Sequence, residues 1–91
     1  MKKTAAWTTQ LSHLQSFLND TRGQITIGEI PPIRRAALAA VGKKARVALV
    51  AGNGETVAQL LERLDAALGR AMAEDSVIDE VLPEIKRRRS T

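Results

Sequence analysis

The glycine-rich segment 52–54, Gly-Asn-Gly, is the part of the sequence most similar to a phosphate-binding loop. It lies between a predicted strand and a predicted helix, where backbone amides can hold a phosphate. A Walker-type loop ends in Gly-Lys followed by Ser or Thr, whereas Gly54 is followed by Glu55 and Thr56. The third glycine of a dinucleotide-binding loop is also missing. We therefore interpret the segment as a tight turn before a helix, and we expect no cofactor and no small-molecule substrate.

The sequence has one histidine, His13, and no cysteine, so it lacks the ligand sets of ordinary transition-metal sites. Ser12 is adjacent to His13, but neighbouring side chains on a helix point about 100° apart and do not form a nucleophile–base pair. The acidic residues near the C-terminus do not follow the alternating pattern of a calcium loop. They are Glu74, Asp75, Asp79, Glu80 and Glu84. We predict no metal site, no catalytic residue and no enzymatic activity.

Charge is distributed unevenly along the sequence. Residues 22–46 contain six basic residues and one acidic residue, whereas residues 47–85 contain two basic and eight acidic residues. This polarity allows three interpretations: a nucleic-acid-binding surface, a contact between oppositely charged parts of two protein molecules, or charge balance within one fold. The candidate contact residues for a partner or a nucleic acid lie in the basic middle segment and the C-terminal tail: Arg34, Arg35, Lys43, Lys44, Arg46, Lys86, Arg87, Arg88 and Arg89.

Apolar periodicity predicts four helices and two strands that would position these residues. The helices are predicted at 4–20, 32–41, 55–73 and 76–85. The first helix carries an apolar stripe of Trp7, Leu11, Leu14 and Leu18. Strands are predicted at 24–30 and 45–51, because both segments are bounded by turn residues and contain β-branched side chains.

One continuous helix from Ile33 to Ala51 is the rival interpretation of the middle segment. The expected fold is therefore α+β, helix-dominated, with two short β-strands, and the alternative is an all-α bundle. At 91 residues the sequence fits one small domain. We expect this domain to span 1–85 and to be followed by a basic, disordered tail at 86–91, which has no apolar anchor.

No apolar run approaches the ~18 residues of a membrane span. Because a small domain without cysteine suits a reducing compartment, we expect a cytoplasmic protein. The sequence predicts a small, non-enzymatic accessory or interaction domain of bacterial type that acts through protein–protein contact, with a homodimer as one candidate assembly. The alternative is a small nucleic-acid-associated regulatory protein that uses the basic middle segment and the tail.

Overall fold

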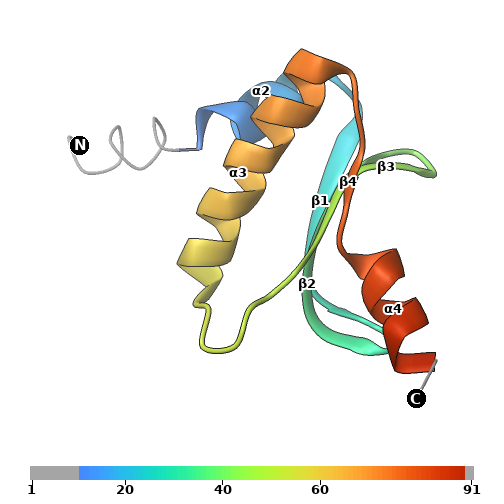
Figure 1. Cartoon of the computed structure of the whole chain (residues 1–91). Helices are drawn as coiled ribbons and strands as arrows, with labels where there is room; N and C mark the ends of the chain where they lie inside the picture. The colour runs from blue at the N-terminus through green and yellow to red at the C-terminus, as the bar shows by residue number, and fades with distance from the viewer. Residues whose placement is uncertain (1–10, 90–91) are drawn as a thin grey trace.

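The computed structural model describes residues 11–89, which form a four-stranded sheet with three helices around it (Figure 1). The strand order in the sheet is β1-β2-β3-β4, the same as the order in the chain. The elements are α2 (Ser12–Asp20), β1 (Gly23–Ile30), β2 (Ile33–Val41), β3 (Lys44–Val50), α3 (Val57–Glu74), β4 (Ile78–Asp79) and α4 (Val81–Arg89).

The sheet is mixed, because its first three strands form an antiparallel meander and its fourth runs parallel to the third. Helix α3 connects β3 to β4, as a parallel pair requires a long crossover. The register aligns Ala39 of β2 with Val47 of β3, and Val47 with Ile78 of β4. The same row begins at Ile25 of β1. This row crosses all four strands and forms the floor of the core.

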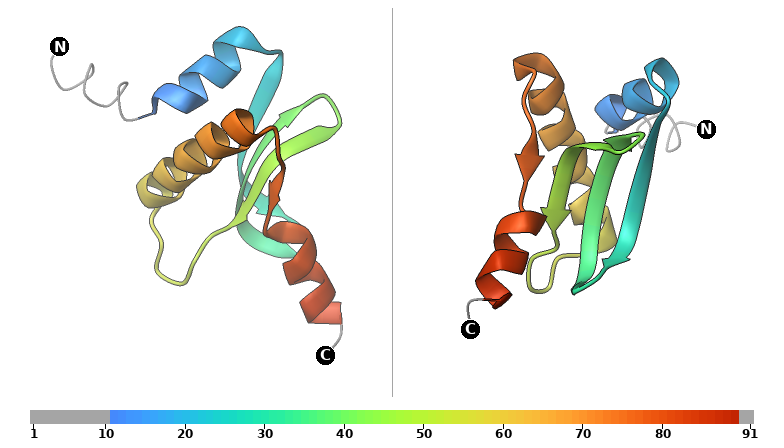
Figure 2. Two further views of the ribbon diagram at one scale, coloured as in Figure 1. Left: turned by 45° about the horizontal axis from the view of Figure 1, so that its top comes forward. Right: turned by 90° about the vertical axis from the view of Figure 1, so that its right-hand side faces the viewer.

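The two faces of the sheet are covered differently. Helices α2 and α3 pack on one face, and α4 lies on the other side at one end (Figure 1 and Figure 2). The core lies under α3, whose Leu60, Leu64 and Leu68 are each at most 1% exposed. Phe17 of α2 extends this core. Ala36 and Ala48 are buried outside this cluster.

The prediction of a helix at 32–41 is wrong, and it is the main reason that the helix-dominated fold class is wrong. The segment is the central strand β2, hydrogen-bonded to β1 and β3. Alanine favours an isolated helix, but tertiary context overrides such propensities. Ala37 and Ala39 are fully buried beneath the helices, where small side chains permit close approach of α3. The all-α bundle and the single helix over 33–51 are excluded by the same strands.

The predicted helix at 76–85 is also wrong in its first half. Ile78 and Asp79 form β4, and the helix begins at Val81. The Asp79 carboxylate accepts hydrogen bonds from the backbone N–H groups of Val81 and Leu82, so it caps the helix. Pro83 lies in the first turn, where a missing N–H costs no helical hydrogen bond, and it therefore does not end the helix.

The other predicted elements agree with the structure within a few residues. The strands at 24–30 and 45–51 correspond to β1 and β3, and the helix at 55–73 corresponds to α3. Residues 12–20 of the predicted first helix form α2, whereas residues 4–10, with Trp7, lie outside the described residues. Of the predicted tail at 86–91, residues 86–89 are the last turn of α4, and 90–91 lie outside the described residues. Within residues 11–89, no helix has the length and apolar character needed to cross a bilayer.

Candidate binding site

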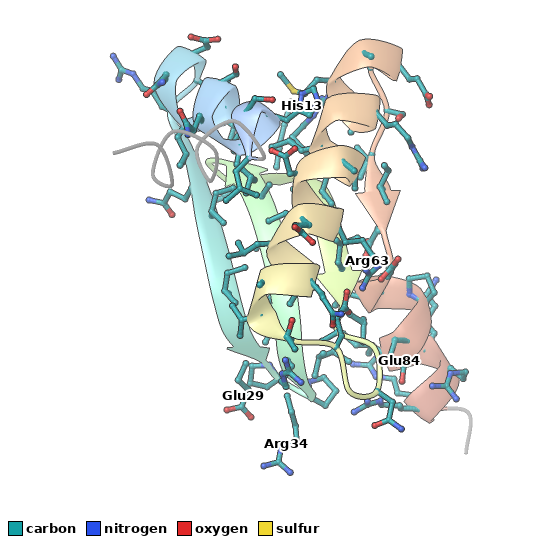
Figure 3. All side chains as sticks on the ribbon, turned by 90° about the vertical axis from the view of Figure 1, so that its left-hand side faces the viewer. His13, Glu29, Arg34, Arg63 and Glu84 are labelled. Carbon is teal, nitrogen blue, oxygen red and sulfur yellow. The ribbon has the colours of Figure 1, made fainter. Side chains whose placement is uncertain are left out.

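The sheet separates the basic residues of the middle segment into two groups. Arg34 and Arg35 lie at the start of β2, whereas Lys43 and Lys44 lie in the hairpin that follows its far end. At ~3.3 Å per residue, the two groups are more than about 20 Å apart along the strand. Figure 3 shows Arg34 at the end of the molecule opposite His13. The predicted contact residues therefore do not form one surface.

Arg34 and Arg35 instead meet a residue of the predicted tail. Together with Arg88 of α4 they line an open pocket of about 270 Å³. Ile33 and Val50 contribute apolar side chains to it. The remaining wall is the loop after β3, formed by Ala51, Gly52, Asn53 and Gly54. We call this site the arginine pocket.

Hydrogen bonds to backbone carbonyls hold two of the three arginines. Arg35 Nη2 donates to the carbonyl oxygen of Glu55 at 2.6 Å, and Arg88 Nη1 donates to that of Pro32 at 3.1 Å. The Arg34 side chain makes no hydrogen bond or ion pair within residues 11–89. Neither carbonyl bond cancels the positive charge of the guanidinium that donates it, so the pocket can attract an anion.

Glu84 is the acidic residue that balances part of this charge. Its carboxylate accepts from Arg87 at 2.6 Å and from Arg88 at 2.8 Å. The hydrogen bond from Arg87, followed by that from Arg88, lowers the pKa of Glu84, and the pKa of Arg87 is raised in return. Lys86 and Arg89 add two further basic residues to the exposed end of α4. Glu29, near the end of β1, is a further carboxylate at this end of the sheet (Figure 3).

A partly exposed ion-pair network, which the sequence analysis did not predict, fixes the pocket wall. Arg63 of α3 donates to Glu55 at 3.0 Å and to Glu80 at 2.9 Å, and Nη2 reaches the carbonyl oxygen of Val50 at 2.8 Å. Glu55 also accepts from the N–H of Gly52 at 2.7 Å. The Arg63 hydrogen bond, with help from the Gly52 N–H, lowers the pKa of Glu55, and the bond from Glu55 raises the pKa of Arg63. The loop that lines the arginine pocket is thus tied to α3.

Arg46 serves the opposite end of the fold. Its guanidinium Nη2 donates to the Ala71 carbonyl oxygen at 3.3 Å and lies 3.6 Å from Asp75, at the C-terminal end of α3. A cation near a helix C-terminus is favoured by the helix dipole. The Arg46 Nε atom is buried and has no hydrogen-bond partner. The structure therefore places Arg46 apart from the arginine pocket.

The acidic residues near the C-terminus are dispersed as well. Asp79 caps α4, Glu80 binds Arg63, and Glu84 binds α4 arginines. Within residues 11–89, no three His, Cys, Asp or Glu side chains are grouped so that they could hold a metal ion. His13 packs against Gly69 of α3, where an added Cβ would lie 2.7 Å from its Nε2 atom. This contact gives His13 a packing role between α2 and α3.

The chain matches no protein-family model, no curated protein and no solved structure.

Proposed function

We propose that this protein is a non-enzymatic interaction domain that binds an acidic protein segment in the arginine pocket. The observation that carries the proposal is the convergence of Arg34 and Arg35 with Arg88, which is more than 50 residues away in the sequence. Three arginines line one open hollow, so an anion bound there would be attracted by several positive charges. A cytoplasmic location, which suits a chain without cysteine, belongs to the same proposal.

The chemistry of the pocket suits a carboxylate side chain. A guanidinium offers paired N–H donors that match the two oxygens of a carboxylate. At about 270 Å³ the hollow is at the lower limit of the range for small-molecule sites, so it accommodates a side chain better than a cofactor. Val50, which is partly exposed, gives the methylene groups of a glutamate an apolar surface to contact.

The layout favours an acidic peptide over a nucleic acid. A nucleic-acid duplex presents phosphates along its whole length, so its binding gains from a continuous basic stripe. Here Lys43 and Lys44 lie at the other end of β2, and Glu29 and Glu84 flank the arginine pocket. The positive surface is therefore short, which suits one acidic side chain of a peptide better than the continuous phosphates of a duplex.

Fluorescence anisotropy with two labelled probes tests the proposal: a peptide of about ten glutamates and a DNA duplex of about 20 base pairs. We expect the peptide to bind, and R34A/R88A to weaken its binding about tenfold, since two charge-assisted contacts are removed. The matched control K43A/K44A removes the same charge at the far end of β2 and should change the affinity less than about twofold.

Equal weakening by the two double variants would mean that net charge, and not the arginine pocket, attracts the peptide. Binding of the duplex alone, with an affinity that falls steeply with salt, would replace the protein partner by a nucleic acid. Either result would contradict the proposed function. Circular dichroism of both variants confirms that the comparison is made between folded proteins.

A further inference from the structure

Two of the three pocket arginines lie on the same face of the sheet. Side chains alternate between the faces of a strand, so Arg35 lies on the face of Ala37 and Arg34 on the opposite face. Ala37 belongs to the core under α3, and Arg35 accordingly donates to the Glu55 carbonyl oxygen in the loop before α3. Arg34 therefore lies on the face where α4 supplies Arg88 (Figure 2).

The arginine pocket has three walls, and each comes from a different part of the chain. They are β2 with Arg34, α4 with Arg88, and the loop of residues 51–54. The middle of this loop, Gly-Asn-Gly, has no bulky side chain, so an anion can approach it closely. The Asn53 side chain makes no hydrogen bond within residues 11–89, and its amide group is a donor. The pocket can therefore offer donors from three directions.

Glu55, the carboxylate that follows this loop, does not face the pocket. In the sequence it stands after Gly54, where a Walker-type loop has its lysine, and there it would repel a phosphate. In the structure its carboxylate accepts from Arg63 at 3.0 Å and from the Gly52 N–H at 2.7 Å. Glu55 is not among the residues that line the pocket. Its charge is thus offset by Arg63 and does not prevent an anion from binding.

Positive charge exceeds negative charge at this end of the sheet. The carboxylates here are Glu29 and Glu84, and the network of Arg63 with its two glutamates adds one further negative charge. The attraction of a bound anion to such a surface increases with the charge of the anion. The basic residues are Arg34, Arg35, Lys86, Arg87, Arg88 and Arg89.

Glu84 sets a further condition, because it already binds the Nε atom of Arg88 at 2.8 Å. A carboxylate from a partner would have the same charge as Glu84 and would compete with it for this guanidinium. An anion with a higher charge would be attracted more strongly by the remaining positive residues. The pocket therefore favours a dianion over a carboxylate.

We propose that the acidic group bound in the arginine pocket is the phosphoryl group of a phosphorylated serine or threonine in the partner segment. This inference rests on the proposed function and specifies the chemistry of its ligand. A phosphoryl group carries a charge of about −1.5 to −2 at neutral pH and has three acceptor oxygens. One oxygen can face each wall, at Arg34, Arg88 and Asn53. A carboxylate can bind the same arginines, but its two oxygens leave one wall without an acceptor.

Three labelled peptides test the choice of group. They share the same flanking glutamates and differ in one central residue, which is serine, glutamate or phosphoserine. In fluorescence anisotropy at pH 7.5 we expect the phosphoserine peptide to bind about fivefold more tightly than the glutamate peptide, since it gains charge and one acceptor. R34A/R88A should reduce this preference below about twofold, whereas the matched control K43A/K44A should retain it.

The titration of the peptide gives a second readout. The second pKa of phosphoserine is about 6, so at pH 5 the group has mostly a single negative charge, as glutamate has. The pocket lining contains no histidine. Glu84 stays ionised, because hydrogen bonds from Arg87 and Arg88 lower its pKa. We therefore expect the preference of the wild-type protein for phosphoserine to fall below about twofold at pH 5.

Each contrary result has a distinct meaning. Equal affinities for the glutamate and phosphoserine peptides would refute this inference and leave the proposed function standing. A preference that R34A/R88A retains, or that persists at pH 5, would also overturn it. Displacement of the phosphoserine peptide by an equal concentration of inorganic phosphate would identify free phosphate, and not a partner segment, as the ligand. If none of the three peptides bound, both proposals would be contradicted.

Discussion

Arg63 shows how one side chain organises the region behind the arginine pocket. Nε and Nη2 bind Glu55, Nη1 binds Glu80, and Nη2 also reaches the Val50 carbonyl oxygen, so all three guanidinium nitrogens donate. These partners come from the end of β3, the loop before α3 and the residue between β4 and α4. Sequence patterns gave no indication of this role, because the partners are 8 to 17 residues away on three different elements.

We expect R63A to lower the free energy of unfolding by about 2–3 kcal/mol, the range for losing hydrogen bonds to charged groups. R63K should recover little of this free energy, because an ammonium group lacks the planar fork of donors that reaches three partners. Urea denaturation measures both. The matched control is R70A on the same helix, an exposed arginine that should change stability by less than about 0.5 kcal/mol. Equal effects of R63A and R70A would contradict the structural role of the network.

The arginine pocket marks the limit of residue-level prediction. Arg34, Arg35 and Arg88 were all identified as contact residues from their charge, together with Lys43, Lys44 and Arg46. Charge along the sequence does not indicate which of them come together. Arg88 reaches β2 because α4 packs on the face of the sheet opposite α3, and the sequence pattern did not predict that placement.

At the scale of elements, α2 begins without a cap of its own. Its N-cap residue is Leu11, which has no side-chain oxygen, and no acidic residue lies in the first turn. Asp65 of α3 supplies the acceptor, because its Oδ1 atom accepts from the N–H of Leu14 at 2.9 Å. Asp65 is 6% exposed. A carboxylate from a neighbouring helix thus accepts the hydrogen bond of a first-turn N–H group, which the side chain of an N-cap residue accepts in most helices.

Replacing Asp65 should therefore loosen α2 from α3. We expect D65A to cost about 1–3 kcal/mol, since it leaves a buried N–H without a partner. D65N retains an amide oxygen and should cost less. Thermal unfolding followed by circular dichroism measures the difference. If D65N and D65A were equally destabilising, the acceptor role of Asp65 would be refuted.

The sequence predicts those helices and strands whose apolar residues follow one clear periodicity. It does not predict those whose conformation depends on tertiary contacts. The apolar stripe of α3 and the β-branched residues of β1 each indicate their structure locally. β2 is different, because Ile33–Val41 is rich in alanine and has the intrinsic preference of a helix. Its conformation comes from hydrogen bonds to β1 and β3, and β4 forms because α3 returns the chain beside β3.

At the scale of the whole molecule, folding pairs many of the unevenly distributed charges with specific partners. Six of the eight acidic residues at 47–85 have a specific partner. Glu55 and Glu80 bind Arg63, Glu84 binds Arg87, and Asp75 lies beside Arg46. Asp65 accepts from Leu14 and Asp79 caps α4. The arginine pocket keeps unbalanced positive charge. Folding thus neutralises the acidic half more completely than the basic segment.

Because Glu55 is ion-paired in the folded protein, the free energy of unfolding depends on pH under acidic conditions. The pKa of Glu55 is lowered from 4.5 in the folded protein, so its ionised form stabilises the fold fully above about pH 4.5. Below that pH the unfolded chain takes up the proton first, and this stabilisation is lost as the pH falls through the lowered pKa. We expect the free energy of unfolding to fall less steeply between pH 5 and pH 3 in E55Q than in the wild type.

Chemical denaturation at several pH values gives both slopes. E62Q, which changes an exposed carboxylate elsewhere on α3, is the control and should follow the wild-type slope. A slope for E55Q as steep as that of the wild type would show that Glu55 does not contribute to acid sensitivity.

Helix α4 has no fully buried residue, although it supplies Arg88 to the arginine pocket. An element held by so little interior contact detaches at a lower free energy than global unfolding requires. Each detachment removes one of the three guanidinium groups that surround the pocket. If an anion binds there as proposed, occupancy of the pocket and attachment of the helix are thermodynamically linked, and we expect the anion to slow amide hydrogen exchange throughout the last nine described residues.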